Sequence, residues 1–132
     1  MERSLRVDHK EGDLFEVSVR QHVICVDQPL EDGGTDLAPT PTETFVASLA
    51  SCVAFYVRRF LRRHDLSTDG LAVTAMFTMG ERPSRVGEVR LSIEIPSGVP
   101  EERQAALLAV ASRCTVHSSL EHPPLVAIDL AA

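Results

Sequence analysis

Apolar and polar residues form short runs over the first 26 residues, a pattern typical of β-strands joined by tight turns. The pattern begins at Leu5 to Asp8 and continues in valine-rich runs around Val17 and Val23. Turn sequences, Glu11-Gly12-Asp13 and Arg20-Gln21-His22, separate these runs. We therefore expect an antiparallel meander of about three strands at the N-terminus.

A long helix is predicted after a loop rich in glycine and proline. Thr40 is suited to the N-cap, Pro41 to the first helical position and Glu43 to closing a capping box with Thr40. The helix should run to about His64, and its first part, Phe45 to Val57, contains no charged residue. A helix that is apolar on every face needs cover on every face. Because so short a chain has few elements to provide that cover, a partner subunit could supply it.

The second half of the chain predicts a hairpin. Its expected strands are Leu71 to Thr78 and Val86 to Ile95, joined by a loop at Gly80 to Gly87. The second strand alternates apolar and polar residues, as expected for a strand with one buried face.

A second helix is expected to begin around Pro100, with Cys114 near its end on the apolar face. A last strand is predicted at Leu125 to Leu130, after an irregular stretch. Helices grouped between antiparallel runs indicate an α+β fold rather than a parallel one, and we interpret residues 1–132 as a single domain.

Composition narrows the functional classes. The chain has 132 residues, 13 Lys and Arg against 19 Asp and Glu, and a net charge of −6, which argues against a nucleic-acid-binding surface. No export signal is recognisable, so we expect a cytoplasmic protein. The longest uncharged apolar stretch, Phe45 to Val57, has 13 residues, whereas a membrane-spanning helix needs about 20, so no membrane association is expected.

Three cysteines, an odd number in a chain without an export signal, argue against a disulfide framework and for catalytic or redox chemistry, if any. Cys25 is in phase with Val23 in a strand, so we interpret it as a packing residue. Cys52 and Cys114 lie on apolar faces of two predicted helices. They are either inert core residues or, if the helices bring them together, a pair capable of a peroxidase cycle.

Other candidate residues have simple structural interpretations. Cys114 and His117 have a C-x-x-H spacing, but one such pair is a poor zinc signal, and we expect no metal. Glu43 is sufficiently explained by the capping box. Four arginines crowd the last turns of the long helix, and we interpret them as a solvated face that compensates the helix dipole: Arg58, Arg59, Arg62 and Arg63.

Two sequence blocks together resemble the OsmC/Ohr family, the osmotically inducible and organic hydroperoxide resistance proteins. The first block leads through a loop and prolines to a cysteine-bearing helix, and the second surrounds the other helical cysteine. They read Val26-Asp27-Gln28-Pro29, Gly33-Gly34-Thr35-Asp36, Pro39-Thr40-Pro41 and Phe45-Val46-Ala47-Ser48-Leu49-Ala50-Ser51-Cys52, then Cys114-Thr115-Val116-His117-Ser118-Ser119-Leu120 with Pro123-Pro124.

This resemblance implies an intertwined homodimer in which antiparallel sheets from both chains wrap around long central helices, with active sites at the subunit interface. It also implies a thiol peroxidase that reduces organic hydroperoxides in oxidative-stress defence, without metal or cofactor. Cys52 matches the peroxidatic cysteine and Cys114 the resolving one. A dithiol or a lipoyl protein would be the reductant.

The chain departs from the peroxidase branches at two positions and is closer to an OsmC-like branch. Those branches have a glutamate directly after the motif proline, where this chain has Thr42, with the carboxylate one place later at Glu43. They also carry an arginine near the first hairpin, for which Lys10 or Arg20 is the candidate here. Glu43 and Arg20 are therefore the expected supporting residues of the site.

Two alternatives remain open from the sequence. The first is a non-enzymatic dimer of the same fold that binds a small apolar or anionic ligand at the subunit interface while its cysteines stay reduced. The second is a hydrolase on a hot-dog-like scaffold, which also wraps a sheet around a long helix, although no nucleophile or base is evident besides the cysteines.

Overall fold

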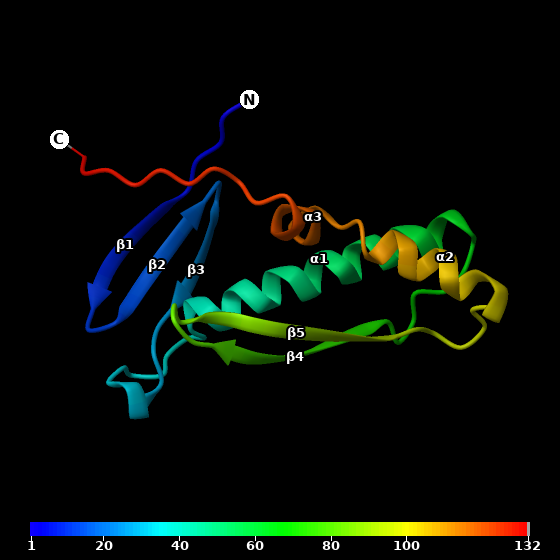
Figure 1. The fold of residues 1–132 in the computed structure, drawn as a ribbon, viewed down its shortest axis with the longest axis horizontal. Coiled ribbons are helices and arrows are strands. Elements are labelled where there is room, and N and C mark those ends of the chain that lie inside the picture. Colours follow the sequence, from blue (N-terminus) through cyan, green and yellow to red (C-terminus); the bar gives the residue numbers. More distant parts are fainter. Residues whose placement is uncertain (132) are drawn as a thin grey trace. The chain divides into compact units, whose positions relative to one another are not determined.

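The computed structural model describes residues 1–131 as an α+β chain with two antiparallel sheets and helices (Figure 1). The expected fold class is confirmed in this respect. The chain forms two compact units, Met1–Val46 and Ala47–Ala132, so that the boundary falls inside the long helix α1 (Pro41–Arg63).

The first unit contains a three-stranded sheet in the order β1-β2-β3. Its strands are β1 (Arg6–Glu11), β2 (Leu14–Val19) and β3 (His22–Val26), and each pairs antiparallel with the next. The expected N-terminal meander is therefore confirmed. Both connecting turns contain a residue in the left-handed region, Gly12 at φ 57° and Arg20 at φ 52°.

A buried carboxylate organises the loop that follows β3. Asp27 is 1% exposed and accepts hydrogen bonds from the Thr35 hydroxyl at 2.7 Å and from the backbone amides of Gln28 and Leu37 at 2.7 and 3.1 Å. These bonds, the one from Thr35 first, lower the pKa of Asp27 from 3.8 to about 2. The loop, which includes the short 3-10 helix η1 (Leu30–Asp32), is thus fixed by one ionised side chain.

Close backbone packing in the same loop explains one of its glycines. A Cβ atom added to Gly34 would lie 2.0 Å from the carbonyl oxygen of Gln28, well inside van der Waals contact. Only glycine permits this approach. At Gly34, one of the two adjacent glycines, steric contact with the backbone therefore excludes any larger residue.

The predicted capping box opens α1. The Thr40 hydroxyl accepts from the Glu43 amide at 3.0 Å, and the Glu43 carboxylate accepts from the Thr40 amide at 2.9 Å. Both bonds satisfy amides that the first helical turn leaves without partners. The local sequence alone thus fixes where this helix begins.

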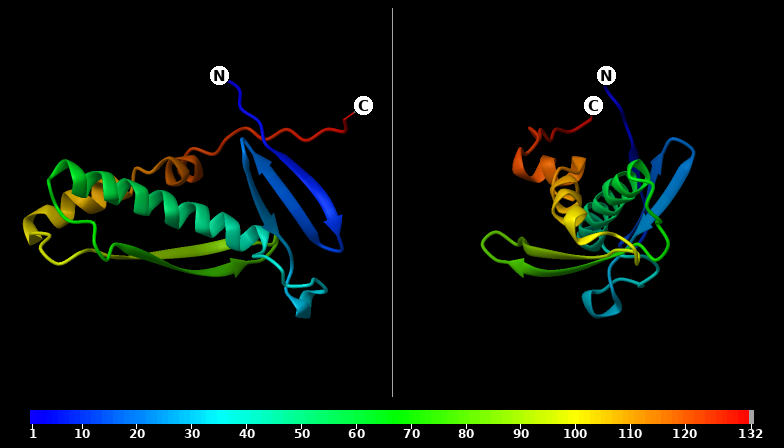
Figure 2. Two further views of the ribbon diagram at one scale, coloured as in Figure 1. Left: turned by 180° about the vertical axis from the view of Figure 1, so that it is seen from behind. Right: turned by 90° about the vertical axis from the view of Figure 1, so that its right-hand side faces the viewer.

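The second unit consists of the rest of α1, a hairpin and two short helices. The hairpin strands are β4 (Ala72–Gly80) and β5 (Arg85–Glu94), and the helices are α2 (Glu101–Ala111) and α3 (Thr115–Glu121). Figures 1 and 2 show α1 and α2 on the same side of the hairpin. The alternation along β5 follows from this arrangement, because its apolar side chains are half-buried and its polar ones exposed.

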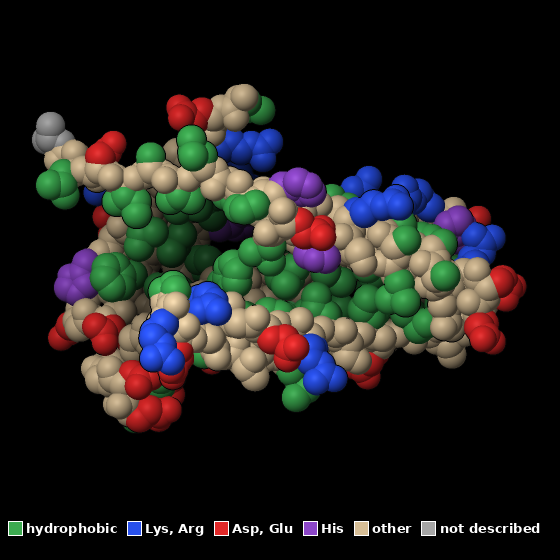
Figure 3. Space-filling model, viewed as in Figure 1, with side chains coloured by type: hydrophobic (Ala, Val, Ile, Leu, Met, Phe, Trp, Pro, Cys, Tyr) green, Lys and Arg blue, Asp and Glu red, His purple; other side chains and the backbone are tan. Residues whose placement is uncertain are grey.

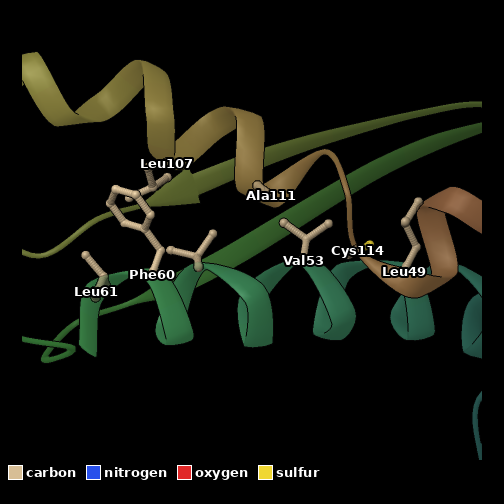
Figure 4. Close-up of a cluster of buried hydrophobic side chains, with 8 residues drawn as sticks. Leu49, Val53, Phe60, Leu61, Leu107, Ala111 and Cys114 are labelled. Atoms are coloured by element: carbon tan, nitrogen blue, oxygen red, sulfur yellow. The ribbon is translucent and has the colours of Figure 1, made fainter. Parts of the chain in front are cut away.

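The core of the second unit lies between α1 and α2. Figure 4 shows its side chains directed toward one another, and hairpin residues such as Val89 and Leu91 pack against them. The α1 residues follow helical spacing of three or four, as expected for one face. The buried cluster is Leu49, Val53, Val57, Phe60, Leu61, Leu107, Ala111 and Cys114.

Helix α1 is long and apolar enough to cross a membrane by length and composition, with 23 residues and a mean hydropathy of 1.3 in its most apolar window. A core helix meets the same test. One third of that window is buried inside the structure, and four arginines lie in the last two turns of the helix. The contacts of its buried face with α2 and the hairpin account for part of its apolar character.

Three expectations for the second unit are wrong. The hairpin turn comprises only residues 81–84, because both strands extend further than their apolar runs. Cys114 is not helical within α2, which ends at Ala111; it precedes α3, a helix that the irregular composition concealed. Leu125 to Leu130 forms no strand in the described chain, because no neighbouring strand pairs with it.

The Asp27 carboxylate should make stability depend on acid pH. Because its folded pKa of about 2 lies below the ordinary 3.8, ionised Asp27 stabilises the folded chain above about pH 4. That contribution should disappear as the pH falls from about 4 to about 2. Urea unfolding across this range measures it.

Two variants make this test specific. Asp27→Asn should lower stability at neutral pH and show a shallower loss in acid, whereas the exposed Asp13→Asn should keep the wild-type profile. Identical acid profiles for the wild type and Asp27→Asn would contradict the assignment.

Candidate functional site

Cys52 and Cys114 lie together in the second unit. Cys52 is half-buried on α1 and packs against the buried cluster that contains the fully buried Cys114, near enough to raise the pKa of the Cys114 thiol. Both thiols are free, without a disulfide. Figure 4 shows Cys114 lying against the α1 face that carries Leu49 and Val53. Two cysteines that are 62 positions apart in the sequence thus meet at one point of the core.

The backbone around Cys114 explains how its sulfur is held. Cys114 is the N-cap of α3, with extended backbone angles of φ −62° and ψ 151°. Its Sγ accepts a hydrogen bond from the His117 amide at 3.3 Å. A thiol sulfur here takes the place that a serine or aspartate oxygen usually occupies.

Burial controls the ionisation of Cys114. Desolvation is the largest influence and raises the pKa of this thiol, and the neighbouring Cys52 raises it further, while the His117 amide opposes both. Cys114 therefore keeps its proton at neutral pH.

A tyrosine next to the pair joins the same two helices. The hydroxyl groups of Tyr56 and Thr115 are 2.9 Å apart and share a hydrogen bond. Tyr56 lies one turn after Cys52 on α1, and Thr115 directly follows Cys114. The bond therefore fixes the spacing between the segments that carry the two thiols.

The sequence interpretation missed Tyr56 and Thr115, although it contained a signal. Tyr56 is the only tyrosine of the chain and stands four residues after a candidate cysteine. Four residues is the spacing that places two side chains on one helix face. The partner was not recognisable, because α3 itself was not predicted.

A small apolar hollow of about 160 Å³ lies among the elements that carry the pair. Its polar lining residues are Ser112 and His117, and the His117 Nε2 atom lies 4.0 Å from the Glu121 carboxylate. It is smaller than the pockets that hold drug-sized ligands. The lining includes Val53 of α1, Leu91 and Ile93 of β5, Leu108 and Ala111 of α2, and His117 of α3.

The other candidate residues belong to the first unit. Arg20 is exposed in the turn between β2 and β3, and Glu43 is engaged with Thr40 in the capping box. Cys25, which we expected to pack, is exposed on β3. The structure therefore joins Cys52 to Cys114 and gives Glu43 a structural role.

A resident metal ion has no evident ligands. Within residues 1–131 no group of three or more His, Cys, Asp or Glu side chains is arranged to hold one. The reactive groups of the described site are thus two thiols and the polar side chains around them.

Comparison with known proteins identifies the family. Residues 33–129 match the family model described as OsmC-like protein, so the chain belongs to the OsmC-like family. No curated protein matches the chain.

Solved structures share the fold at low sequence identity. A Psychrobacter arcticus 273-4 protein, named for osmotic stress induction and a detoxification response, is 23% identical with a TM-score of 0.83, over 90% of this chain and 88% of that one. The Legionella pneumophila organic hydroperoxide resistance protein OsmC is 21% identical with a TM-score of 0.67, over 89% and 88%. An OsmC-like protein of Mycoplasma pneumoniae is 17% identical with a TM-score of 0.78, over 93% and 89%.

The Tyr56–Thr115 hydrogen bond can be tested by a double-mutant cycle. Tyr56→Phe and Thr115→Val each remove one partner, and each should lower the free energy of unfolding by about 0.5–1.5 kcal/mol. The double variant should lose less than the sum, because the bond can be lost only once. Urea unfolding of the four proteins measures the coupling, and strictly additive losses would show that the bond contributes nothing.

Proposed function

We propose that this protein is a thiol peroxidase that reduces organic hydroperoxides through Cys52 and Cys114. The observation that carries the proposal is the packing of Cys52 on α1 against the buried cluster that includes Cys114 at the start of α3. Membership of the OsmC-like family supports it, as do structural neighbours named organic hydroperoxide resistance proteins. The role in oxidative-stress defence follows from that activity.

The proposed reaction has two steps, oxidation of Cys52 by the peroxide and formation of a disulfide with Cys114. The Cys52 thiolate attacks one peroxide oxygen, an S–O bond forms and the O–O bond breaks, and the alkoxide leaves and takes up a proton as the alcohol. Cys114 then attacks the sulfur of the Cys52 sulfenic acid, forming the disulfide and releasing water. An external dithiol, free or on a lipoyl protein, reduces the disulfide and becomes a disulfide itself.

The different environments of the thiols support this division of roles. Cys114 is buried and its raised pKa keeps it protonated, which suits a resolving thiol that must not compete for the peroxide. Cys52 is half-buried, which suits the sulfur that must meet a substrate. The apolar hollow of about 160 Å³ beside these elements suits the organic group of a small hydroperoxide.

Arg20 is the proposed cation that supports the thiolate. Lys10, the other candidate, has its ammonium 3.6 Å from the Glu16 carboxylate and is already paired. Arg20 has no carboxylate partner within residues 1–131. Its place on an exposed turn leaves the guanidinium available to a site completed by other parts of the protein.

A homodimer is the proposed assembly. The apolar run Leu125 to Leu130 is almost fully exposed, with Leu125 at 100% and Ile128 at 93%, and its backbone pairs with no strand. Phe55 on α1 is also half exposed. Exposed apolar chain of this kind marks an interface, and an extended segment with free backbone groups suits addition to a sheet edge of a second copy.

The cysteine mechanism is tested by mixing reduced protein with cumene hydroperoxide and following intact mass over seconds. The wild type should lose about two mass units, mapped to a Cys52–Cys114 disulfide. Cys52→Ser should abolish peroxide consumption. Cys114→Ser should consume one equivalent and leave a sulfenic acid that dimedone traps.

Controls separate this chemistry from general thiol oxidation. Cys25→Ser should behave as the wild type, and Arg20→Gln should slow the first step more than Lys10→Gln. Wild-type activity in Cys52→Ser would overturn the mechanism. Unchanged mass over minutes would instead favour the ligand-binding dimer with reduced cysteines.

The dimer is tested by removing apolar side chains from one side of the terminal run. Val126→Ser, Ile128→Ser and Leu130→Ser together should raise the dimer dissociation constant by about 100-fold or more, because each buried side chain contributes roughly 1.5–3 kcal/mol. Leu125→Ser, on the other side of an extended segment, should have a smaller effect. Sedimentation velocity measures the constant, and a monomeric wild type would contradict the assembly.

A further inference from the structure

An arginine-lined hollow lies beside the C-terminal half of α1. It measures about 210 Å³ and is lined by Tyr56, Arg59, Arg63, Val110 and Arg113. Arg59 and Arg63 lie one turn apart on α1, and Arg113 comes from the connection between α2 and α3. The three guanidinium groups therefore converge from two separate segments of the second unit.

These arginines form no ion pair within the described residues. Within residues 1–131 the ion pairs are Arg6–Asp8, Lys10–Glu16 and His117–Glu121, and none of the three arginines belongs to them. Figure 3 shows basic side chains, all of them arginines, gathered on the surface over α1 and α2. A concentration of positive charge in a chain of net charge −6 is a local feature that the overall composition hides.

The helix dipole explains only part of this cluster. Arginines in the last turn of α1 are favourable there because the helix C-terminus carries partial negative charge. Arg113 follows the C-cap of α2 and is favoured by the end of that helix, but neither dipole accounts for its lining the same hollow as the α1 arginines. Three like charges around one hollow repel one another unless an anion lies between them.

The residues that line the hollow also favour one kind of anion over another. Planar guanidinium groups form paired hydrogen bonds with phosphate and carboxylate oxygens, and three groups from two segments match a tetrahedral dianion better than one planar carboxylate. The Tyr56 ring and Val110 add an apolar wall. The Arg59 guanidinium lies between two aromatic rings, 5.6 Å from the centre of the Phe55 ring and 5.9 Å from that of the Tyr56 ring.

We propose that this hollow binds the phosphate group of a small phosphate monoester, whose organic part lies against Tyr56 and Val110. This site goes beyond the proposed peroxidase function and does not depend on it. The ligand would bind at one turn or more from Cys52 along α1, and no bond to the ligand is made or broken.

The proposal is tested by titrating the purified protein with phenyl phosphate, using NMR chemical shifts or calorimetry. Binding should be saturable and stronger than that of inorganic phosphate or benzoate. Arg113→Gln and Arg59→Gln should each weaken it by about tenfold or more, because a charge-assisted hydrogen bond is lost. Thermal unfolding and circular dichroism show whether each variant is folded.

Arg62→Gln is the matched control, because it removes the same charge from the same helix without lining this hollow. It should weaken binding by less than about threefold. If Arg62→Gln and Arg113→Gln weakened phenyl phosphate binding equally, the anion would be attracted by the general positive charge of this surface, and the proposed site would be contradicted. The absence of saturable phenyl phosphate binding would also contradict the proposed site. So would binding only to phosphatidylcholine vesicles that contain phosphatidic acid.

Discussion

Helix α1 imposes the main physical constraint on this molecule, because it has more apolar surface than one chain can cover. Its uncharged segment buries Leu49, Val53 and Val57 against α2 and the hairpin. Phe55 points away from that core and stays half exposed. Burial of one face therefore determines the fold of the second unit, while the remaining apolar face is the one that the proposed homodimer would cover.

The same constraint creates the thiol pair. Cys52 occupies the edge of the buried face, and Cys114 closes the core at the point where α2 has ended and α3 begins. A serine at either position would bury a hydroxyl group, whereas a thiol packs as a small hydrophobe and still reacts. The hydrogen bond between Tyr56 and Thr115 holds the two segments in register beside the sulfurs. Packing and chemistry thus use the same residues.

The sequence predicts what local patterns determine. Thr40 and Glu43 fix the start of α1, and alternation fixes β5, because each depends on residues a few positions apart. Prediction from the sequence fails for elements whose formation depends on residues far away in the chain. Leu125 to Leu130 has strand composition but no paired neighbour, and α3 depends on a sulfur N-cap that propensity rules do not contain.

The sequence also could not predict that Arg113 lines the same hollow as the α1 arginines, because this depends on the path of the chain after α2. Along α1, Arg59 is about 10 Å and Arg63 about 16 Å from Cys52 by helical rise. At physiological salt the screening length is about 8 Å, so an anion held by Arg59 and Arg63 has little direct electrostatic effect on Cys52. Arg113 also lines the hollow and directly precedes Cys114, so the hollow comes closer to the second thiol. Tyr56 provides another link, because it lines the hollow and also bonds to Thr115 beside Cys114. Any coupling between an anion and the thiol pair would therefore involve the segment that carries Arg113 or the packing of this tyrosine.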